Sequence, residues 1–160
     1  MSVKKTVAKI IHIAYPTAVF RLFSKYGYRG TYYHQGWDVT AKNRTVVRGG
    51  LPFKVMWVGY DHVSGIFVTV WYPSLNLFCC FAHLDSTTVN KGQVCKTMAQ
   101  IGYSGYTGHT IPDNVPAGAH LHMEFGKVMT KYGYITDASK INPALLYWVS
   151  QKDMKKLLAS

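Results

Sequence analysis

The chain has 160 residues, 48% of them hydrophobic, which is enough for one domain with a sizeable core and too apolar for a disordered protein. Its 18 lysines and arginines outnumber 7 acidic residues, and the formal net charge of +11 indicates an anionic partner: nucleic acid, a membrane surface or an anionic cell-wall polymer. No run of about 18 apolar residues occurs, which excludes a transmembrane helix.

Aromatic residues are abundant, with 12 Tyr, 7 Phe and 4 Trp, and they favour β-strands. Together with 14 Gly and 6 Pro as turn residues, they predict a mainly β fold. The three cysteines are too few for a fold held by disulfides. Cys79 and Cys80 are adjacent in an apolar run and are interpreted as buried reduced thiols, although a bridge from one of them to Cys95 remains open.

The first 30 residues form a basic and aromatic extension. Residues 10–20 are apolar, but His12 and Pro16 interrupt them and no small-residue cleavage site follows, so this segment is not interpreted as a signal peptide. Residues 18–26 are expected to form a short helix that ends at Gly27.

The segment His34-Gln35-Gly36-Trp37-Asp38 places a histidine and a carboxylate four residues apart. A helix would put them on one face, but Gly36 and the following β-branched residues argue against a helix. A bent passage from loop to strand can also bring both side chains to one point. Taken alone, the pair is more often an ordinary hydrogen-bonded turn histidine and turn aspartate.

Three strand-like runs follow, at residues 53–60, 66–72 and 75–84, with turn signals between them. They predict a meander of antiparallel strands. The third run carries His83 near its end, where a lone histidine is usually a hydrogen-bonded core residue.

The next segment, residues 98–108, contains three glycines and is expected to turn tightly. No lysine follows them, which excludes a phosphate-binding loop, and residues 109–119 are interpreted as loop. Residues 127–137 are expected to form a hairpin around Gly133. A short helix is predicted from Asn142 as N-cap and Pro143 at the first helical position.

The segment His120-Leu121-His122-Met123-Glu124-Phe125 alternates as a strand does, so that both histidines and Glu124 share one face and the apolar residues face the core. Two imidazoles about 7 Å apart on one strand can share a metal and its bound water. A catalytic zinc commonly has two histidines and a carboxylate as ligands. The residues His34, Asp38 and His122 supply that set, which leaves His83 and His120 free to handle protons.

Other chemistries find less support in the sequence. There is no His-Glu-x-x-His helix, no zinc-finger cysteine spacing and no Gly-x-Ser-x-Gly elbow. A serine triad of Ser104, a histidine and Asp38 or Asp85 can be written down, but the strand–turn–helix context of a nucleophilic serine is missing. No nucleic-acid-binding module accompanies the basic charge, so a specific nucleic-acid partner is not expected.

Taken in order, these motifs resemble the lysostaphin/LytM-type zinc endopeptidases of bacterial cell walls. The resemblance rests on His34-x-Gly-x-Asp38, Phe81-Ala-His-Leu84, the glycine-rich run 101–108, His120-Leu-His-Met-Glu-Phe125 and the closing Ile141-Asn-Pro143. It covers about residues 30–147. Each motif alone is modest, but the first four of them in this order and spacing are specific.

The resemblance implies a small antiparallel β-sheet with short peripheral helices and a groove whose floor carries one zinc ion. It implies that His34, Asp38 and His122 are the zinc ligands and that His83 and His120 are the catalytic histidines. The implied activity is zinc-dependent endopeptidase cleavage of cross-links or stem peptides in bacterial peptidoglycan. The longer loop before His120 borders the groove and leaves the substrate preference open.

In some members of that family, a tyrosine just upstream of the first ligand helps to stabilise the transition state. The corresponding tyrosines here are Tyr28, Tyr32 and Tyr33, and the sequence does not choose among them.

We interpret residues 1–160 as a single domain with the basic N-terminal extension and a basic C-terminal tail. The absence of a clear signal peptide favours a bacteriophage lysin, released at lysis or carried on the virion, over a secreted bacterial autolysin. An inactive zinc-binding structural or activator domain of the wall or of a phage tail is the alternative function.

Overall fold

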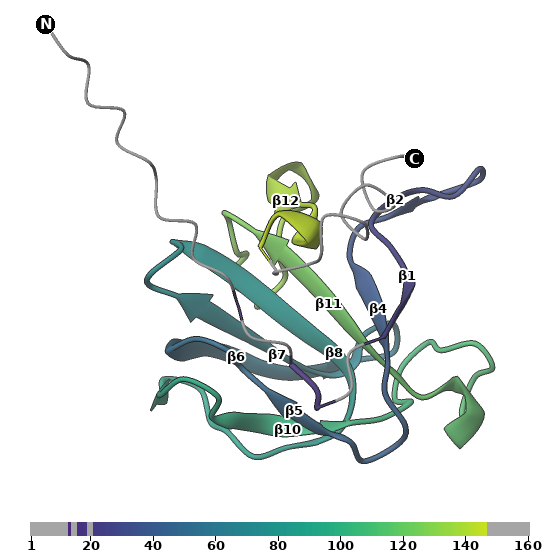
Figure 1. Cartoon of the computed structure of the whole chain (residues 1–160), viewed down its shortest axis with the longest axis horizontal. Helices are drawn as coiled ribbons and strands as arrows, with labels where there is room; N and C mark the ends of the chain where they lie inside the picture. The colour runs from purple at the N-terminus through teal and green to yellow at the C-terminus, as the bar shows by residue number, and fades with distance from the viewer. Residues whose placement is uncertain (1–12, 14–15, 19–20, 147–160) are drawn as a thin grey trace, which may run out of the picture.

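The computed structural model describes residue 13, residues 16–18 and residues 21–146, so most of the expected N-terminal extension and the C-terminal tail lie outside the described residues. Figure 1 shows one large twisted antiparallel sheet with the strand order β1-β4-β11-β8-β7-β6-β9. The strands of this path are β1 (Leu22–Ser24), β4 (Trp37–Thr40), β11 (His120–Gly126), β8 (Leu77–Thr87), β7 (Gly65–Tyr72), β6 (Phe53–Asp61) and β9 (Val94–Cys95).

Shorter elements extend this sheet at its margins. The strand β10 (Gln100–Ser104) pairs with β8 and with β5 (Val46–Arg48), and β12 (Lys140–Ile141) pairs with β11. A separate hairpin joins β2 (Gly27–Tyr28) to β3 (Tyr33–His34). The helices of the described chain are three 3-10 turns, η1 (Pro116–Gly118), η2 (Asp137–Ser139) and η3 (Pro143–Leu145). The mainly antiparallel β fold is therefore confirmed, and its peripheral helices are single turns.

The meander expected from the sequence is present as β6, β7 and β8, each antiparallel to the next. The turn between β6 and β7 is fixed by Asp61, whose Oδ1 accepts hydrogen bonds from the backbone N–H groups of Val63 and Ser64. The cap of η3 is also confirmed, because the Asn142 side chain accepts a hydrogen bond from the N–H of Ala144. All three cysteines are free and buried, which confirms Cys79 and Cys80 as buried thiols and leaves neither bridged to Cys95.

The helix expected over residues 18–26 is wrong, because Leu22–Ser24 forms β1 instead. The physical reason is a non-local partner: Leu22 lies opposite Val39 and Ser24 opposite Asp38 in an antiparallel pair with β4. Pairing at a sheet edge satisfies the backbone groups of this segment and overrides its weak local preference for helix.

The glycine-rich segment also differs from expectation, since Gln100–Ser104 is a strand and not a tight turn. Gly102 serves close packing here, because a Cβ at this position would lie 2.2 Å from the carbonyl oxygen of Ser86. The hairpin expected over residues 127–137 is reduced to one bridge between Met129 and Ile135, with Gly133 at a positive φ of 86° in the turn.

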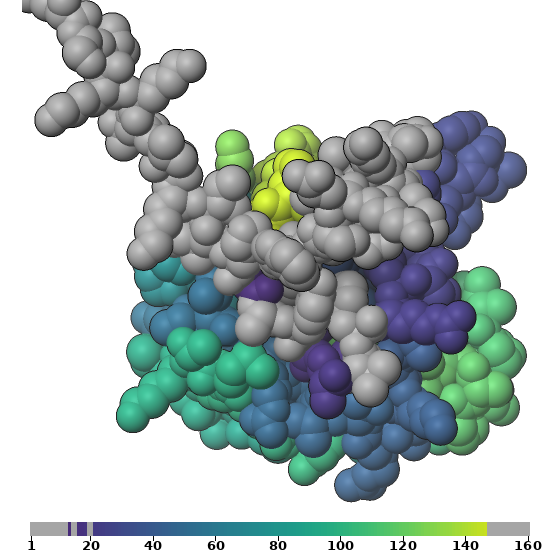
Figure 2. Space-filling view, in the orientation of Figure 1, coloured from purple at the N-terminus to yellow at the C-terminus, as the bar shows by residue number. Residues whose placement is uncertain are grey.

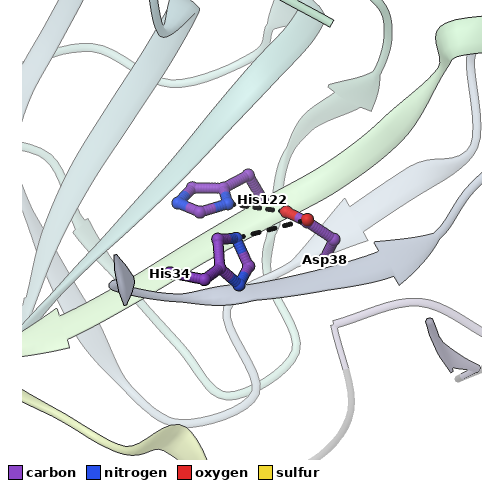
Figure 3. A group of neighbouring side chains, drawn as sticks. All are labelled: His34, Asp38 and His122. Atoms are coloured by element: carbon purple, nitrogen blue, oxygen red, sulfur yellow. Dashed lines mark hydrogen bonds and ion pairs between the residues drawn. The ribbon is translucent and has the colours of Figure 1, made fainter. Parts of the chain in front are cut away.

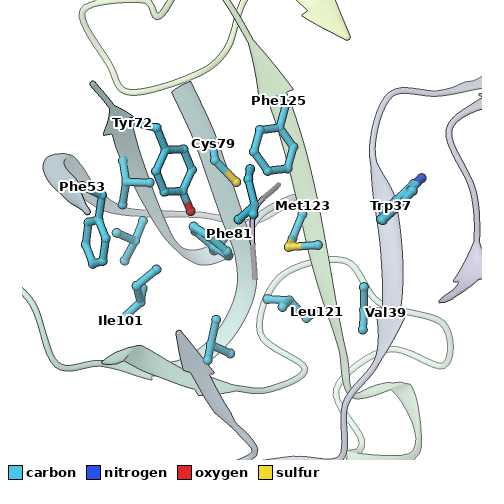
Figure 4. Packing of buried hydrophobic residues seen from close by; sticks show 14 of the residues in the cluster. Trp37, Val39, Phe53, Tyr72, Cys79, Phe81, Ile101, Leu121, Met123 and Phe125 are labelled. Atoms are coloured by element: carbon cyan, nitrogen blue, oxygen red, sulfur yellow. The ribbon is translucent and has the colours of Figure 1, made fainter. Parts of the chain in front are cut away.

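The main core lies against one face of the central strands (Figure 4). The side chains of Leu121, Met123 and Phe125 on β11 point into it and are fully buried, as the alternation of that strand predicted. Tyr72 stacks on Phe125 with an interplanar angle of 17°. Among the described residues, no helix is long and apolar enough to cross a membrane.

Replacing Phe125 by Ala is expected to lower the free energy of unfolding by about 3–5 kcal/mol, because a fully buried ring leaves a cavity that the sheet cannot close. Urea denaturation followed by tryptophan fluorescence measures the loss. Val128→Ala is the control, since that side chain is 52% exposed and its removal should change the free energy by less than about 0.5 kcal/mol. Equal losses for the two variants would contradict this description of the core.

Candidate active site

The strand β11 carries the central residues of the site, because it lies between β4 and β8 (Figure 1). In the β4–β11 pair, His122 lies opposite Asp38, and in the β11–β8 pair it lies opposite Ala82. His34, the first histidine of the site in the sequence, lies on β3. The turn at Gln35 and Gly36 connects β3 to β4. Segments far apart in the sequence thus meet on the face of the sheet opposite the main core.

The side chains of His34, Asp38 and His122 converge on one point, as Figure 3 shows. Asp38 lies between the two imidazoles: its Oδ1 is 2.7 Å from Nδ1 of His122, and its Oδ2 is 3.2 Å from Nε2 of His34. One ligand atom from each residue lies within 4.8 Å of the others. Two imidazole nitrogens and one carboxylate oxygen at this spacing are the donor set of a three-ligand zinc site.

Each of these histidines is oriented by a second contact. Nδ1 of His34 lies 2.9 Å from the carbonyl oxygen of Lys25, which can only accept, so Nδ1 carries a proton and Nε2 is the nitrogen that faces Asp38. The guanidinium of Arg29 lies 3.2 Å from the same nitrogen but donates to Ser24 Oγ and to the Lys25 carbonyl. Nε2 of His122 lies 3.2 Å from Oε1 of Glu124, which leaves Nδ1 to face Asp38.

Gly36 allows the turn before β4 to lie directly against β11. A Cβ at this position would lie 2.4 Å from the carbonyl oxygen of Met123 and 2.8 Å from the ring of His122. The spacing of His34, Gly36 and Asp38 therefore has a physical reason: a side chain in the middle of the turn would push the two ligand segments apart.

His83 reaches the site through a break in the regular strand. Between Phe81 and Leu84, the pairing of β8 with β7 shifts register, so that two residues of β8 oppose one of β7. His83 adopts a positive φ of 61°, which is rare for a residue other than glycine, and its N–H donates to the carbonyl of Ser64. Such a bulge redirects a side chain, and here it turns His83 to the metal-ligand face.

His83 and His120 share one hydrogen-bonding pattern. Nδ1 of His83 lies 2.9 Å from the carbonyl of Thr107, and Nδ1 of His120 lies 2.9 Å from the carbonyl of Gly118. Carbonyl oxygens only accept, so each ring donates from Nδ1, and Nε2 is the nitrogen available for proton exchange. The ring centroids are 4.6 Å apart, and Nε2 of His120 lies 3.6 Å from Oδ1 of Asp38.

Thr107 fixes the backbone of the strands β7 and β8 beside His83, in addition to orienting the His83 ring through its carbonyl. Its hydroxyl donates to the carbonyl of Leu84 and accepts from the N–H of Ile66. The neighbouring Gly108 approaches the β6–β7 turn so closely that a Cβ would lie 2.2 Å from the nitrogen of Gly65.

The site opens into a groove with a volume of about 840 Å³. Its lining includes His34, Asp38, His83, His120 and His122. Its apolar walls include Phe23 on β1, Val63 in the β6–β7 turn and Ile111 in the loop before β11. In Figure 2, the loop before β11 (green) lies along the same edge of the molecule as the projecting β2–β3 hairpin (blue). Of the three candidate tyrosines, Tyr32 lines the groove, whereas Tyr28 and Tyr33 are exposed and do not.

The site residues that the sequence singled out thus lie together, apart from two of the tyrosines. Sequence reasoning missed the backbone carbonyls that orient the histidines, since a carbonyl has no residue signature. It also missed Lys140, whose Nζ lies 3.0 Å from Oε2 of Glu124. Its position just before the Ile141-Asn142-Pro143 motif is the one signal that could have found it.

Residues 32–143 match Peptidase family M23. The chain belongs to this family. No curated protein sequence matches the chain with significance.

Several solved structures have the same fold as this M23 peptidase. LytU is 24% identical with a TM-score of 0.66, over 79% of this chain and 83% of its own. The catalytic domain of EnpA, a prophage-encoded M23 protein from Enterococcus faecalis, is 23% identical with a TM-score of 0.64, over 83% and 93%. The catalytic domain of lysostaphin, an antimicrobial peptidase from Staphylococcus simulans, is 21% identical with a TM-score of 0.63, over 78% and 89%.

The electrostatics of the M23 site separate the ligand residues from His83. Burial alone would raise the pKa of Asp38, yet hydrogen bonds from His122 and His34 hold it well below its usual range. Burial alone would lower the pKa of His122, yet its hydrogen bonds to Asp38 and Glu124 raise it to about 9. For His83, burial and the neighbouring His120 act together and lower the pKa to about 4.

The lowered pKa of His83 predicts a pH-dependent stability of the M23 domain. Its ordinary value is 6.5, so the unfolded chain takes up this proton at a higher pH than the folded chain does. The contribution of neutral His83 to the free energy of unfolding is complete above pH 6.5. Up to about 3 kcal/mol of this contribution is lost as the pH falls towards 4. Urea unfolding of chelator-treated protein at several pH values measures the slope.

His83→Asn should flatten that slope, and asparagine tolerates the positive φ of this position. His62→Asn, in the exposed β6–β7 turn, is the matched control and should keep the wild-type slope. An unchanged slope in His83→Asn would mean that His83 does not hold its neutral form in the fold.

Proposed function

We propose that this M23 peptidase is a zinc-dependent endopeptidase that cleaves peptide cross-links or stem peptides of bacterial peptidoglycan. The observation that carries the proposal is the convergence of His34, Asp38 and His122 in one groove with two further histidines. A domain with only a structural metal has no need of His83 and His120 beside the ligand set, each with Nδ1 bonded to a backbone carbonyl.

The donor set fits one zinc ion. Nε2 of His34, an oxygen of Asp38 and Nδ1 of His122 would hold the ion, and the contacts of the opposite ring nitrogens already select these atoms. When bound, zinc supplies a Lewis acid that polarises a carbonyl and acidifies water, with a fourth position left for substrate or water.

The chain's own residues handle the proton. His120 is well placed to accept it from the attacking water, because its Nε2 lies 3.6 Å from Asp38 Oδ1, at the edge of the ligand set. His83 has a pKa of about 4, and a protonated group of that acidity is a strong donor. We assign His83 to receive on Nε2 the proton that His120 has taken from the water and to deliver it to the leaving amine, since the two rings are 4.6 Å apart.

Tyr32 is the tyrosine that we assign to stabilise the developing oxyanion, in preference to Tyr28 and Tyr33. It is the candidate among the three that lines the groove. It stands in the turn of the β2–β3 hairpin, two residues before His34.

The proposed partner is the bacterial wall with its anionic polymers, to which a formal net charge of +11 attracts the protein. We also propose that the protein is a phage-encoded lysin that acts on this wall; among the similar structures, EnpA is described as prophage-encoded. We further propose that residues 1–160 act as one domain, with the catalytic core at about residues 30–147.

Purified peptidoglycan incubated with the protein is expected to release fragments with new free amino groups, which mass spectrometry identifies. A zinc chelator should abolish the release, and added zinc should restore it, because the three ligands alone do not activate water. If zinc-loaded protein left several wall types uncut, the inactive structural or activator domain would be the better description.

Two neighbouring histidines on β11 should give different phenotypes. His120→Ala is expected to lower cleavage about 100- to 10,000-fold while zinc content stays near one per chain, because it removes only the proton acceptor. His122→Ala should lose both zinc and cleavage, since it removes a ligand. Metal analysis beside the cleavage assay distinguishes them, with His62→Ala as control. Full activity in His120→Ala would refute its assigned role.

A further inference from the structure

Glu124 is the third residue on the histidine face of β11, and it is the only glutamate in the sequence. The two oxygens of its carboxylate contact two different side chains. Oε1 lies 3.2 Å from Nε2 of His122, and Oε2 lies 3.0 Å from Nζ of Lys140. One carboxylate thus joins the imidazole of the candidate metal ligand to an ammonium group.

Lys140 is almost completely buried, with a side chain that is 7% exposed. It lies on β12, opposite Gly126 of β11, so its backbone is fixed by the sheet. Its Nζ contacts three oxygen acceptors, which use all three donors of the ammonium group. The acceptors are Oε2 of Glu124, Oδ1 of Asp137 at 2.9 Å and Oε1 of Gln35.

Gln35 gives this network its second connection to the ligands. It stands in the turn between His34 and Gly36, so the ammonium group of Lys140 joins the turn that carries two ligands to the strand that carries the third. Among the described residues, the group that could hold a metal ion includes neither Glu124, Lys140 nor Gln35, so these three act through the ligand residues.

We propose that Glu124 and Lys140 form a clamp that sets the zinc affinity of the site by positioning His122 and the ligand turn. The inference rests on the proposed zinc-dependent function. Both residues are positioning residues. Glu124 holds the proton of His122 on Nε2, so that Nδ1 faces the metal, and it strengthens that nitrogen as a donor. Lys140 fixes the Glu124 carboxylate and offsets its charge beside Asp38.

The clamp is better explained by metal binding than by stability. A buried ion pair loses much of its attraction to the cost of removing both charges from water, so it is a weak source of folding energy. A carboxylate on the outer nitrogen of a metal-bound histidine, in contrast, typically changes metal affinity or activity by about 10- to 100-fold.

The experiment measures zinc dissociation constants by competition with a chromogenic chelator, together with the thermal midpoint of each metal-free protein. Glu124→Ala should weaken zinc binding about 10- to 100-fold. Glu124→Gln and Lys140→Met keep the side-chain volume and should each weaken it about tenfold. Lys127→Met is the matched control, because it removes an exposed lysine beside the end of β11, and it should bind zinc as the wild type does.

A double variant, Glu124→Gln with Lys140→Met, should bind zinc no more weakly than the weaker single variant, because the two residues act as one unit. If both single variants kept the wild-type dissociation constant and only their thermal midpoints fell, the clamp would be structural and the proposal overturned. A wild-type protein that binds no zinc would instead overturn the proposed function, and the clamp with it.

Discussion

The pairing of β11 with β4 on one side and β8 on the other is the constraint on which the site depends. This register places His122 opposite Asp38 and next to the bulge that carries His83. Because side chains alternate along a strand, a slip of one residue would turn His120, His122 and Glu124 into the core. The buried side chains of Leu121, Met123 and Phe125 make that slip very costly, so the core fixes the positions of the imidazoles.

Regular strand pairing supplies only part of the site, and two local departures from it supply the rest. Gly36 lets the ligand turn lie against the ring of His122, and the bulge with a positive φ at His83 brings a third imidazole to the same face. Both departures would be unfavourable in an ordinary sheet, and both bring a functional side chain into position. The positive φ of His83 is local backbone strain that the fold accepts at this site.

The sequence was informative where the pattern is local and strong. Alternation along residues 120–125 predicted the face of each side chain, and the ordered motifs singled out five residues that the structure brings together in one groove. It failed where a distant partner decides the conformation. Residues 22–24 are a strand because β4 offers an edge, and the ammonium of Lys140 reaches Glu124 only after β12 pairs with β11. The carbonyls that set the tautomers carry no side-chain signal at all.

The contacts of Thr107 separate two parts of one loop. Residues 105–109 are tied to the β6–β7 turn and to His83 through Thr107 and the close approach of Gly108 to Gly65. Residues 111–117 are exposed, and Ile111 at their start borders the groove with 85% of its surface accessible. Substitutions in this outer part can reshape the wall of the groove for a different peptide while the contacts that hold His83 stay the same. His120 is different, because its Nδ1 rests on the carbonyl of Gly118, whose N–H is bonded to the carbonyl of Val115 in the outer part. Change in this part of the loop is therefore free of His83 but linked to His120.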